Sequence, residues 1–205
     1  MKSPIVSVDW LHEHLEDPEL IVLEAILDTP SQDIQIKRAR LFDIKNKFSD
    51  TSNPLPNTLP SPEDFAIACQ KIGIDNNSKI VVYDTKGIYS SPRAWWLFKI
   101  MGHEKVWVLD GGLPAWLNEN YPTENRQEPS YPKGNFEAHF QPQLVKTKEQ
   151  LLKNIQSKKS LVVDARSTDR FQGETKEPRV GLRSGHIPGS INIPYTQVLK
   201  NGKFL

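Results

Sequence analysis

Four arginines lie close together in one stretch of the chain, DARSTDRFQGETKEPRVGLRSGHIPGS at residues 164–190. They are Arg166, Arg170, Arg179 and Arg183. A planar guanidinium can hold a carboxylate or sulfonate through two parallel hydrogen bonds, which attract the anion and also orient it. The residue types therefore indicate either a loop that binds a small anion or a set of ion pairs with the acidic residues of the same stretch.

Cys69 is the only cysteine of the chain and so its only candidate thiol nucleophile. Phe65, Ala68, Cys69 and Ile72 stand at positions i, i+3, i+4 and i+7 of a predicted helix, which places them on one apolar face. A free cysteine on such a face behaves as a small buried hydrophobe, and we interpret Cys69 as a packing residue. A single cysteine excludes an internal disulfide, the scattered histidines indicate no metal site, and no cofactor is expected.

The elements that must position these side chains alternate between helix and strand. Ser61, Pro62 and two acids begin a helix that Gly73 ends, and residues 79–83 form an apolar, β-branched strand. A second helix starts at Ser91-Pro92, and residues 106–109 form a further strand. Strands that alternate with helices predict an α/β fold with a mainly parallel sheet flanked by helices.

The chain also matches itself when it is shifted by about 140 positions. Val22–Ala25 then falls on Val162–Ala165, and in both copies a helix precedes the strand. The second helix has a capping box, Thr147 with Gln150, and Leu151, Leu152 and Ile155 are expected to face the core. We therefore predict a first domain at residues 1–121, a proline-rich linker at 122–143, and at 144–205 the N-terminal part of a second domain whose remaining residues, roughly 60, are absent.

At these motifs the sequence resembles the tandem-domain rhodanese family, the thiosulfate and 3-mercaptopyruvate sulfurtransferases. The resemblance rests on Gly185–Gly189 before Ile191–Pro194, on the arginine stretch, and in the first copy on YDTKGIYSSPRAWW. It implies two rhodanese-like domains and a cysteine persulfide that carries sulfur from mercaptopyruvate or thiosulfate to a thiol or cyanide. The expected partners are therefore a small anionic sulfur donor and one of these acceptors.

By the same resemblance, Arg170 and Arg179 match arginines that bind the donor, although both can also be solvated charges or partners in salt bridges. Asp84 stands at the nucleophile position of the first domain, which is therefore expected to be inactive because a carboxylate cannot form a persulfide. The repeat places the second domain's nucleophile near position 224, beyond Leu205. No catalytic residue is thus assigned, and this chain alone is expected to be inactive.

Other residues in these loops are given different roles. Arg166 and Arg183 are expected to pair with neighbouring acids, and His186 to hydrogen-bond the backbone. Lys45 and Asn57 stand where the mercaptopyruvate branch often has an acid and a histidine, which weakens the assignment of mercaptopyruvate as donor.

Composition limits the function classes. The net charge is +1 over 205 residues, so no overall basic field favours nucleic acid or a membrane surface. The N-terminus lacks the apolar segment of a secretory signal, and a cytoplasmic location is expected. Two alternatives to the enzyme remain: a non-enzymatic rhodanese-like module whose arginines bind an acidic partner, and a cysteine-dependent phosphatase of related fold. The arginines upstream of the Gly-His-Ile-Pro-Gly turn favour the sulfurtransferase over the phosphatase.

Overall fold

The computed structural model describes residues 3–27, 29–30, 32–126 and 129–205. By its internal contacts the chain divides into two compact units, Met1–Pro142 (unit 1) and Gln143–Leu205 (unit 2). Within the described ranges, each helix is too short or too polar to span a lipid bilayer.

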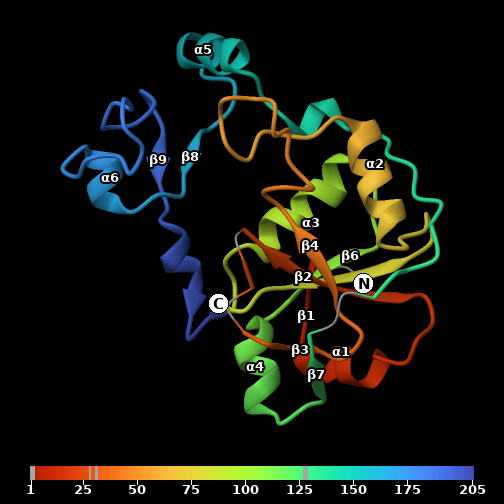
Figure 1. The fold of residues 1–205 in the computed structure, drawn as a ribbon. Coiled ribbons are helices and arrows are strands. Elements are labelled where there is room, and N and C mark those ends of the chain that lie inside the picture. Colours follow the sequence, from red (N-terminus) through yellow and green to blue (C-terminus); the bar gives the residue numbers. More distant parts are fainter. Residues whose placement is uncertain (1–2, 28, 31, 127–128) are drawn as a thin grey trace. The chain divides into compact units, whose positions relative to one another are not determined.

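Unit 1 is an α/β unit around one parallel sheet (Figure 1). In chain order its elements are β1 (Ile5–Val6), α1 (Val8–His14), β2 (Leu20–Ile26), β3 (Ile34–Ile36), β4 (Arg40–Asp43), α2 (Pro62–Lys71), β5 (Lys79–Tyr83), α3 (Ser91–Ile100), β6 (Val106–Leu109), α4 (Gly112–Asn118) and β7 (Thr123–Asn125). The sheet has the order β1-β6-β5-β2-β4, and every neighbouring pair is parallel. The predicted fold class is confirmed.

Helices cover both faces of this sheet, which explains why its central strands are apolar along their whole length. On one face, α1 and α4 pack with alternate strand residues, among them Val81 and Tyr83. On the other face, Phe65 of α2 and Phe98 of α3 pack together with Phe42 of β4. The predicted helix start at Ser61 is also confirmed, because its hydroxyl accepts a hydrogen bond from Asp64 N, and Ser7 caps α1 in the same way by accepting from Trp10 N.

The described residues of 123–142, most of the predicted linker, belong to unit 1. β7 pairs antiparallel with β3, and the Phe136 side chain, 1% exposed, packs between Phe65 and Phe98. Gly134 allows this close approach, since a Cβ at this position would lie 2.1 Å from the carbonyl oxygen of Ile74. The division between the units falls at Pro142 and Gln143, whereas residues 127–128 of the predicted linker lie outside the described residues.

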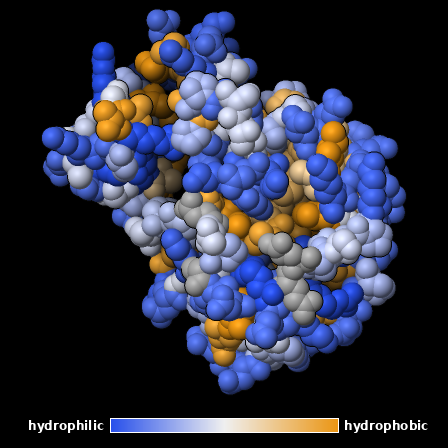
Figure 2. Space-filling model, viewed as in Figure 1, coloured by the Kyte–Doolittle hydropathy of each residue, from blue (hydrophilic) through white to orange (hydrophobic). Residues whose placement is uncertain are grey.

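Unit 2 begins within a 3₁₀ turn (Pro142–Leu144), at Gln143, and contains α5 (Lys148–Ser157), β8 (Val163–Asp164), α6 (Thr168–Gln172), β9 (Ile191–Asn192), a second 3₁₀ turn (Tyr195–Val198), β10 (Leu199–Lys200) and β11 (Lys203–Phe204). The capping box of Thr147 and Gln150 is present. The expectation that Leu152 faces a core is wrong, because it is 54% exposed. Among residues 143–205, all of which are described, Pro194 alone is buried. Unit 2 thus leaves apolar side chains at its surface, as the orange patches on its part of Figure 2 show.

The two units share one local arrangement, which supports the internal repeat. In unit 1, β2 pairs parallel with β4, with Glu24 opposite Leu41. In unit 2, β8 pairs parallel with β9, with Asp164 opposite Asn192. Glu24 and Asp164 are 140 positions apart, which is the offset at which the sequence matches itself.

Candidate functional sites

The arginine stretch of unit 2 forms a network around one carboxylate, that of Glu177. Arg166 donates from Nη1 to Glu177 Oε1 at 2.8 Å, and Arg170 donates from Nη2 to Glu177 Oε2 at 2.6 Å. Arg166 also pairs with Asp164, at 2.5 Å from Nη2 to Oδ2, and donates to the carbonyl of Gly185. The expected pairing of Arg166 with neighbouring acids is confirmed.

These contacts shift the protonation equilibria of the two acids. The hydrogen bond from Arg170 lowers the pKa of Glu177, with Arg166 adding to the effect. The hydrogen bond from Arg166 likewise lowers the pKa of Asp164. Both carboxylates therefore stay ionised at neutral pH, and the network holds two negative charges against two guanidinium groups.

The other two arginines, Arg179 and Arg183, are not part of this network. Arg170 lies on α6, where its side chain is 32% exposed, whereas Arg179 lies in the turn that follows and is exposed to solvent. Neither Arg179 nor Arg183 has an ion-pair partner within residues 143–205, and the expected pairing of Arg183 with an acid is not found there. Within residues 143–205, Arg170 and Arg179 share no hydrogen-bond or ion-pair partner.

His186 has a structural place in the Gly-His-Ile-Pro-Gly turn. Its Nδ1 lies 2.7 Å from the carbonyl oxygen of Phe171, and its ring stacks on the Phe171 ring with centroids 3.8 Å apart. Gly185 and Gly189 flank it at φ values of 107° and 80°, which other residues rarely adopt. The turn thereby ties the end of the arginine stretch to α6, and His186 hydrogen-bonds the backbone as expected.

In unit 1, the loop after β5 surrounds the Asp84 carboxylate with hydrogen-bond donors. Oδ2 accepts from the backbone N–H groups of Tyr89, Ser90 and Ser91 at 2.8–3.0 Å, and also from the Ser91 hydroxyl at 2.7 Å. Oδ1 accepts from the N–H of Lys86 at 2.9 Å. Asp84 is 2% exposed. The loop thus forms a concave nest of donors, of the kind that binds anions, at the start of α3.

A cavity of about 210 Å³ opens next to this loop. It is lined by Ala25, Ile26, Leu27, Thr29, Pro30, Asp84, Thr85, Lys86, Tyr89 and Ser90. These residues lie at the end of β2 and in the segments after β2 and β5. The two strands are neighbours in the sheet, but the chain leaves β2 towards β4 and leaves β5 towards β6. Such a reversal of strand order at the carboxyl ends of parallel strands is where open α/β sheets bind ligands.

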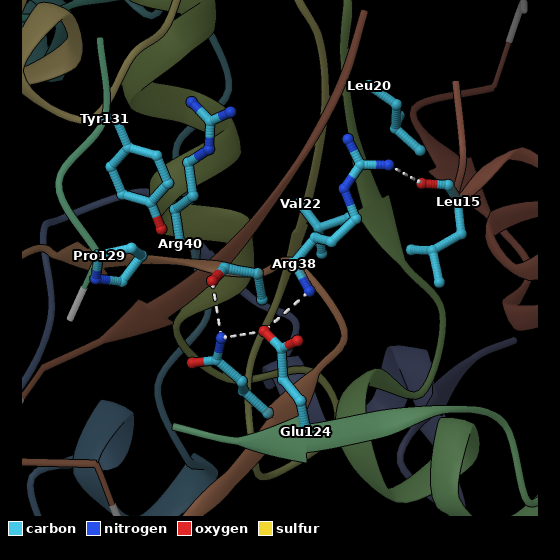
Figure 3. A pocket seen from close by; sticks show the side chains of 10 residues that line it. Leu15, Leu20, Val22, Arg38, Arg40, Glu124, Pro129 and Tyr131 are labelled. Atoms are coloured by element: carbon cyan, nitrogen blue, oxygen red, sulfur yellow. Dashed lines mark hydrogen bonds between the residues drawn. The ribbon is translucent and has the colours of Figure 1, made fainter. Parts of the chain in front are cut away.

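Unit 1 has a second hollow of about 200 Å³, whose polar lining groups hydrogen-bond to one another and to the backbone (Figure 3). Glu124 accepts hydrogen bonds from the Arg38 backbone N–H and from Gln35, while Arg38 donates from Nη1 to the carbonyl of Leu15. Arg40 lies over the Tyr131 ring at 4.4 Å and donates to the carbonyls that end α2. These contacts hold residues 38–40 in place, and they leave no group aimed at a ligand among the described lining residues.

Asn57, in the loop before α2, is hydrogen-bonded to Arg93 of α3. The Asn57 carbonyl accepts from Arg93 Nη2 at 2.6 Å, and Asn57 itself has a φ of 58°. Burial lowers the pKa of Arg93, whose guanidinium lies over the Trp96 ring. Asn57 therefore contributes its backbone to a fixed loop, and Lys45 lies in the same loop region before α2.

Cys69 is fully buried on α2, as the apolar helix face predicted. Burial raises the pKa of its thiol well above the ordinary value, so the reactive thiolate is strongly disfavoured. Its assignment to packing is confirmed.

Sequence analysis missed an ion pair between Glu24, buried on β2, and Arg126, whose side chain is 19% exposed. Arg126 donates from Nη2 to both carboxylate oxygens at 2.8 and 2.9 Å, and the Tyr83 hydroxyl donates to Oε2 at 2.9 Å. Glu24 is 1% exposed. The available signal was a charged residue inside the apolar run Leu20–Ile26, which requires a partner when the strand is buried on both faces.

The fold and the loops together define the class of protein. The family described as Rhodanese-like domain matches residues 7–119 and 147–204, and the chain belongs to this family. The resemblance seen in the sequence is confirmed, in both of the matched segments.

Individual relatives of this chain are named as sulfurtransferases. The mitochondrial thiosulfate/3-mercaptopyruvate sulfurtransferase 1 of Arabidopsis thaliana is 42% identical, over 96% of this chain and 59% of that protein. The 3-mercaptopyruvate sulfurtransferase of Escherichia coli K12 is 38% identical, over 97% of this chain and 73% of that protein. Among solved structures, SseA from Escherichia coli matches with a TM-score of 0.87 and 34% identity, over 100% of this chain and 79% of that chain.

These relatives are sulfurtransferases, so the enzyme is supported over the non-enzymatic binding module. The chain spans between about three fifths and about three quarters of the relatives' length.

Proposed function

We propose that the full-length protein containing this chain is a sulfurtransferase that moves sulfur from 3-mercaptopyruvate or thiosulfate to a thiol or cyanide through a cysteine persulfide. The observation that carries the proposal is the arginine network of unit 2, in a segment that belongs to the rhodanese family. Both donors are small anions, and Arg170 presents a half-exposed guanidinium whose carboxylate partner, Glu177, is also held by Arg166.

The shared carboxylate suggests how Arg170 binds a donor. A donor carboxylate or sulfonate can take the place of Glu177 at Arg170, because Glu177 keeps its hydrogen bond to Arg166. Glu177 then still has a hydrogen-bond partner, so the exchange avoids the desolvation cost of an unpaired carboxylate. We assign Arg170, and with it Arg179, to donor binding and orientation.

The domain arrangement is part of the same proposal. Residues 1–121 form a first domain, 122–143 connect, and 144–205 begin a second, catalytic-type domain. The longer relatives and the nearly coreless unit 2 support the view that the persulfide cysteine belongs to a part of the full-length protein that this chain does not span. We also place the protein in the cytoplasm, which imaging of the full-length protein would test, since one relative is named as mitochondrial.

Cys69 should not act as the sulfur carrier. Its thiol is buried and its pKa is raised, so a thiol-specific reagent should leave it unlabelled in the native chain and label it fully after denaturation. The chain alone should form no thiocyanate from thiosulfate and cyanide. Activity that disappears in Cys69→Ser would contradict this assignment.

The proposal is tested by the donor preference of the full-length protein. Two guanidinium groups can bind a keto acid at its carboxylate and its carbonyl, so we expect a higher kcat/KM for mercaptopyruvate than for thiosulfate. The attacking thiolate takes the donor sulfur, the carbon–sulfur bond breaks, and its electron pair and the donor's thiol proton go to carbon, which gives pyruvate.

Arg179→Ala should reduce this preference, whereas Arg183→Ala, an equally exposed arginine four residues later, should not. The readout is pyruvate formation and thiocyanate formation by the same preparation. A preference for thiosulfate that Arg179→Ala leaves unchanged would reject mercaptopyruvate as the donor, and transfer from neither donor would reject the function.

A further inference from the structure

One buried polar atom of unit 1 lacks a hydrogen-bond partner. Among the described residues, the Nε atom of Arg93 is the single buried side-chain nitrogen or oxygen without one. A buried donor that is left unpaired destabilises the fold, because its hydrogen bonds to water are lost and not replaced. The surroundings of Arg93 show what kind of acceptor is missing.

The positive charge of Arg93 has no negative counterpart in the part of the chain that the structure describes. Its Nη2 donates to the neutral carbonyl of Asn57 at 2.6 Å, and its guanidinium lies 4.9 Å from the centroid of the Trp96 ring. Burial lowers the pKa of Arg93, and no neighbouring acid opposes this shift. A charge is thus held partly away from water with a carbonyl dipole and an aromatic face as its partners.

The place of Arg93 in α3 adds to this imbalance. Arg93 is the third residue of the helix, whose first turn contains no acidic residue, and the helix dipole disfavours a cation at this end and favours an anion. The other three arginines of unit 1 have partners, since Arg38 pairs with Glu16, Arg126 pairs with Glu24, and Arg40 donates to the carbonyls where α2 ends. Arg93 is therefore the arginine of unit 1 whose charge the described residues leave uncompensated.

Part of the guanidinium is open to a ligand. Arg93 is half-buried, and its Nη1 makes no hydrogen bond within the described residues and is not buried. The loop that supplies the Asn57 carbonyl is exposed at each residue from 51 to 57. A small anion can therefore approach along the Nη1 edge and reach Nε with a shift of this exposed loop.

We propose that Arg93 binds one small anion, a carboxylate or an oxyanion such as sulfate, with an oxygen of the anion accepting from Nε–H. The anion supplies the missing acceptor and the missing negative charge together, and the Trp96 ring supports the plane of the guanidinium. The inference rests on unit 1 and does not depend on the sulfur transfer proposed above, whose donor we assigned to Arg170 in unit 2.

The first test follows the Nε–H signal of Arg93 by heteronuclear NMR while this chain is titrated with pyruvate and, separately, with sulfate at constant ionic strength. The signal should shift to saturation and its proton should exchange more slowly with water, because the proton gains an acceptor. The Nε–H signal of Arg126 is the control, since that guanidinium is already paired with Glu24. No shift at Arg93 with either anion, or an equal shift at Arg126, would overturn the proposal.

Arg93→Met separates ligand binding from a structural role. Methionine can still cover the Trp96 ring but removes the charge and the unpaired donor, so without added anion its urea midpoint should be no lower than that of the wild type. Pyruvate or sulfate should raise the midpoint of the wild type more than that of Arg93→Met, because binding stabilises the folded state by mass action. Tryptophan fluorescence reports unit 1 alone, since all five tryptophans lie within residues 10–116.

Arg38→Met is the matched variant for this comparison. It removes an arginine of the same unit whose charge Glu16 balances, so it should respond to both anions as the wild type does. Equal responses of the wild type and Arg93→Met would overturn the proposal and leave Arg93 with the role of holding the Asn57 carbonyl.

Discussion

Arg170→Ala in the full-length protein should lower kcat/KM for an anionic sulfur donor by about 30- to 1000-fold, which corresponds to the loss of roughly 2–4 kcal/mol from a charge-assisted, bidentate contact. The loss should appear with mercaptopyruvate and with thiosulfate alike, because both present an anionic group to the same guanidinium. The melting temperature should change little, since Glu177 keeps its hydrogen bond to Arg166 when Arg170 is removed.

Two further variants distinguish the bidentate contact of Arg170 with the donor from a general effect of positive charge in this segment. Arg170→Lys keeps the positive charge but loses the planar fork, so it should recover only part of the activity. Arg183→Ala removes one exposed arginine from the same segment and should leave kcat/KM within about twofold of the wild type, as exposed charges contribute little. A loss below threefold for Arg170→Ala with both donors would show that Arg170 serves only the ion pair with Glu177.

The parts of the fold that could be predicted from the sequence are those set by local chemistry. Helix starts at Ser7, Ser61 and Thr147 follow from a side chain that accepts from a backbone N–H within three residues. The strand at residues 79–83 follows from an uninterrupted apolar run. Each of these signals lies within a few residues of the element that it predicts.

The parts that could not be predicted depend on contacts between distant segments. β1 has only two residues, and its place is set by pairing with β6 about a hundred positions later. Phe136 lies among prolines and glycines that are typical of a linker, and only the aromatic cluster of Phe65 and Phe98 gives it a buried place. Leu152 fits a core stripe by its spacing, but nothing in unit 2 covers it.

The candidate sites show the same division. The position of Asp84 in its loop could be predicted from the motif, whereas the convergence of donors on its carboxylate depends on backbone geometry that the residue types do not reveal. The arginine stretch indicated anion binding or ion pairs, and the structure contains the ion pairs, with Glu177 between Arg166 and Arg170. Glu24 and Arg126, more than a hundred residues apart in the chain, gave no joint signal.

The remaining prediction with a large effect concerns this buried pair. Arg126→Ala should destabilise unit 1 by about 3–5 kcal/mol, because it leaves the buried carboxylate of Glu24 with the Tyr83 hydroxyl as its remaining hydrogen-bond partner among the described residues. Urea unfolding followed by tryptophan fluorescence measures the effect on unit 1 alone. Lys37→Ala is the matched control, since its ion pair with Glu16 is exposed on both sides and should contribute less than about 1 kcal/mol.

The double variant Glu24→Gln/Arg126→Ala distinguishes a stranded charge from lost packing. If the cost of Arg126→Ala comes from the unpaired carboxylate, the neutral amide should restore at least about 1 kcal/mol, since the Tyr83 hydroxyl can still donate to the amide oxygen. If the cost came from the contacts of the Arg126 side chain with the carbonyls of Gln32 and Ile34, the double variant would be as unstable as Arg126→Ala. That second result would mean that Arg126 stabilises unit 1 through the carbonyls of Gln32 and Ile34, and that its ion pair with Glu24 contributes little.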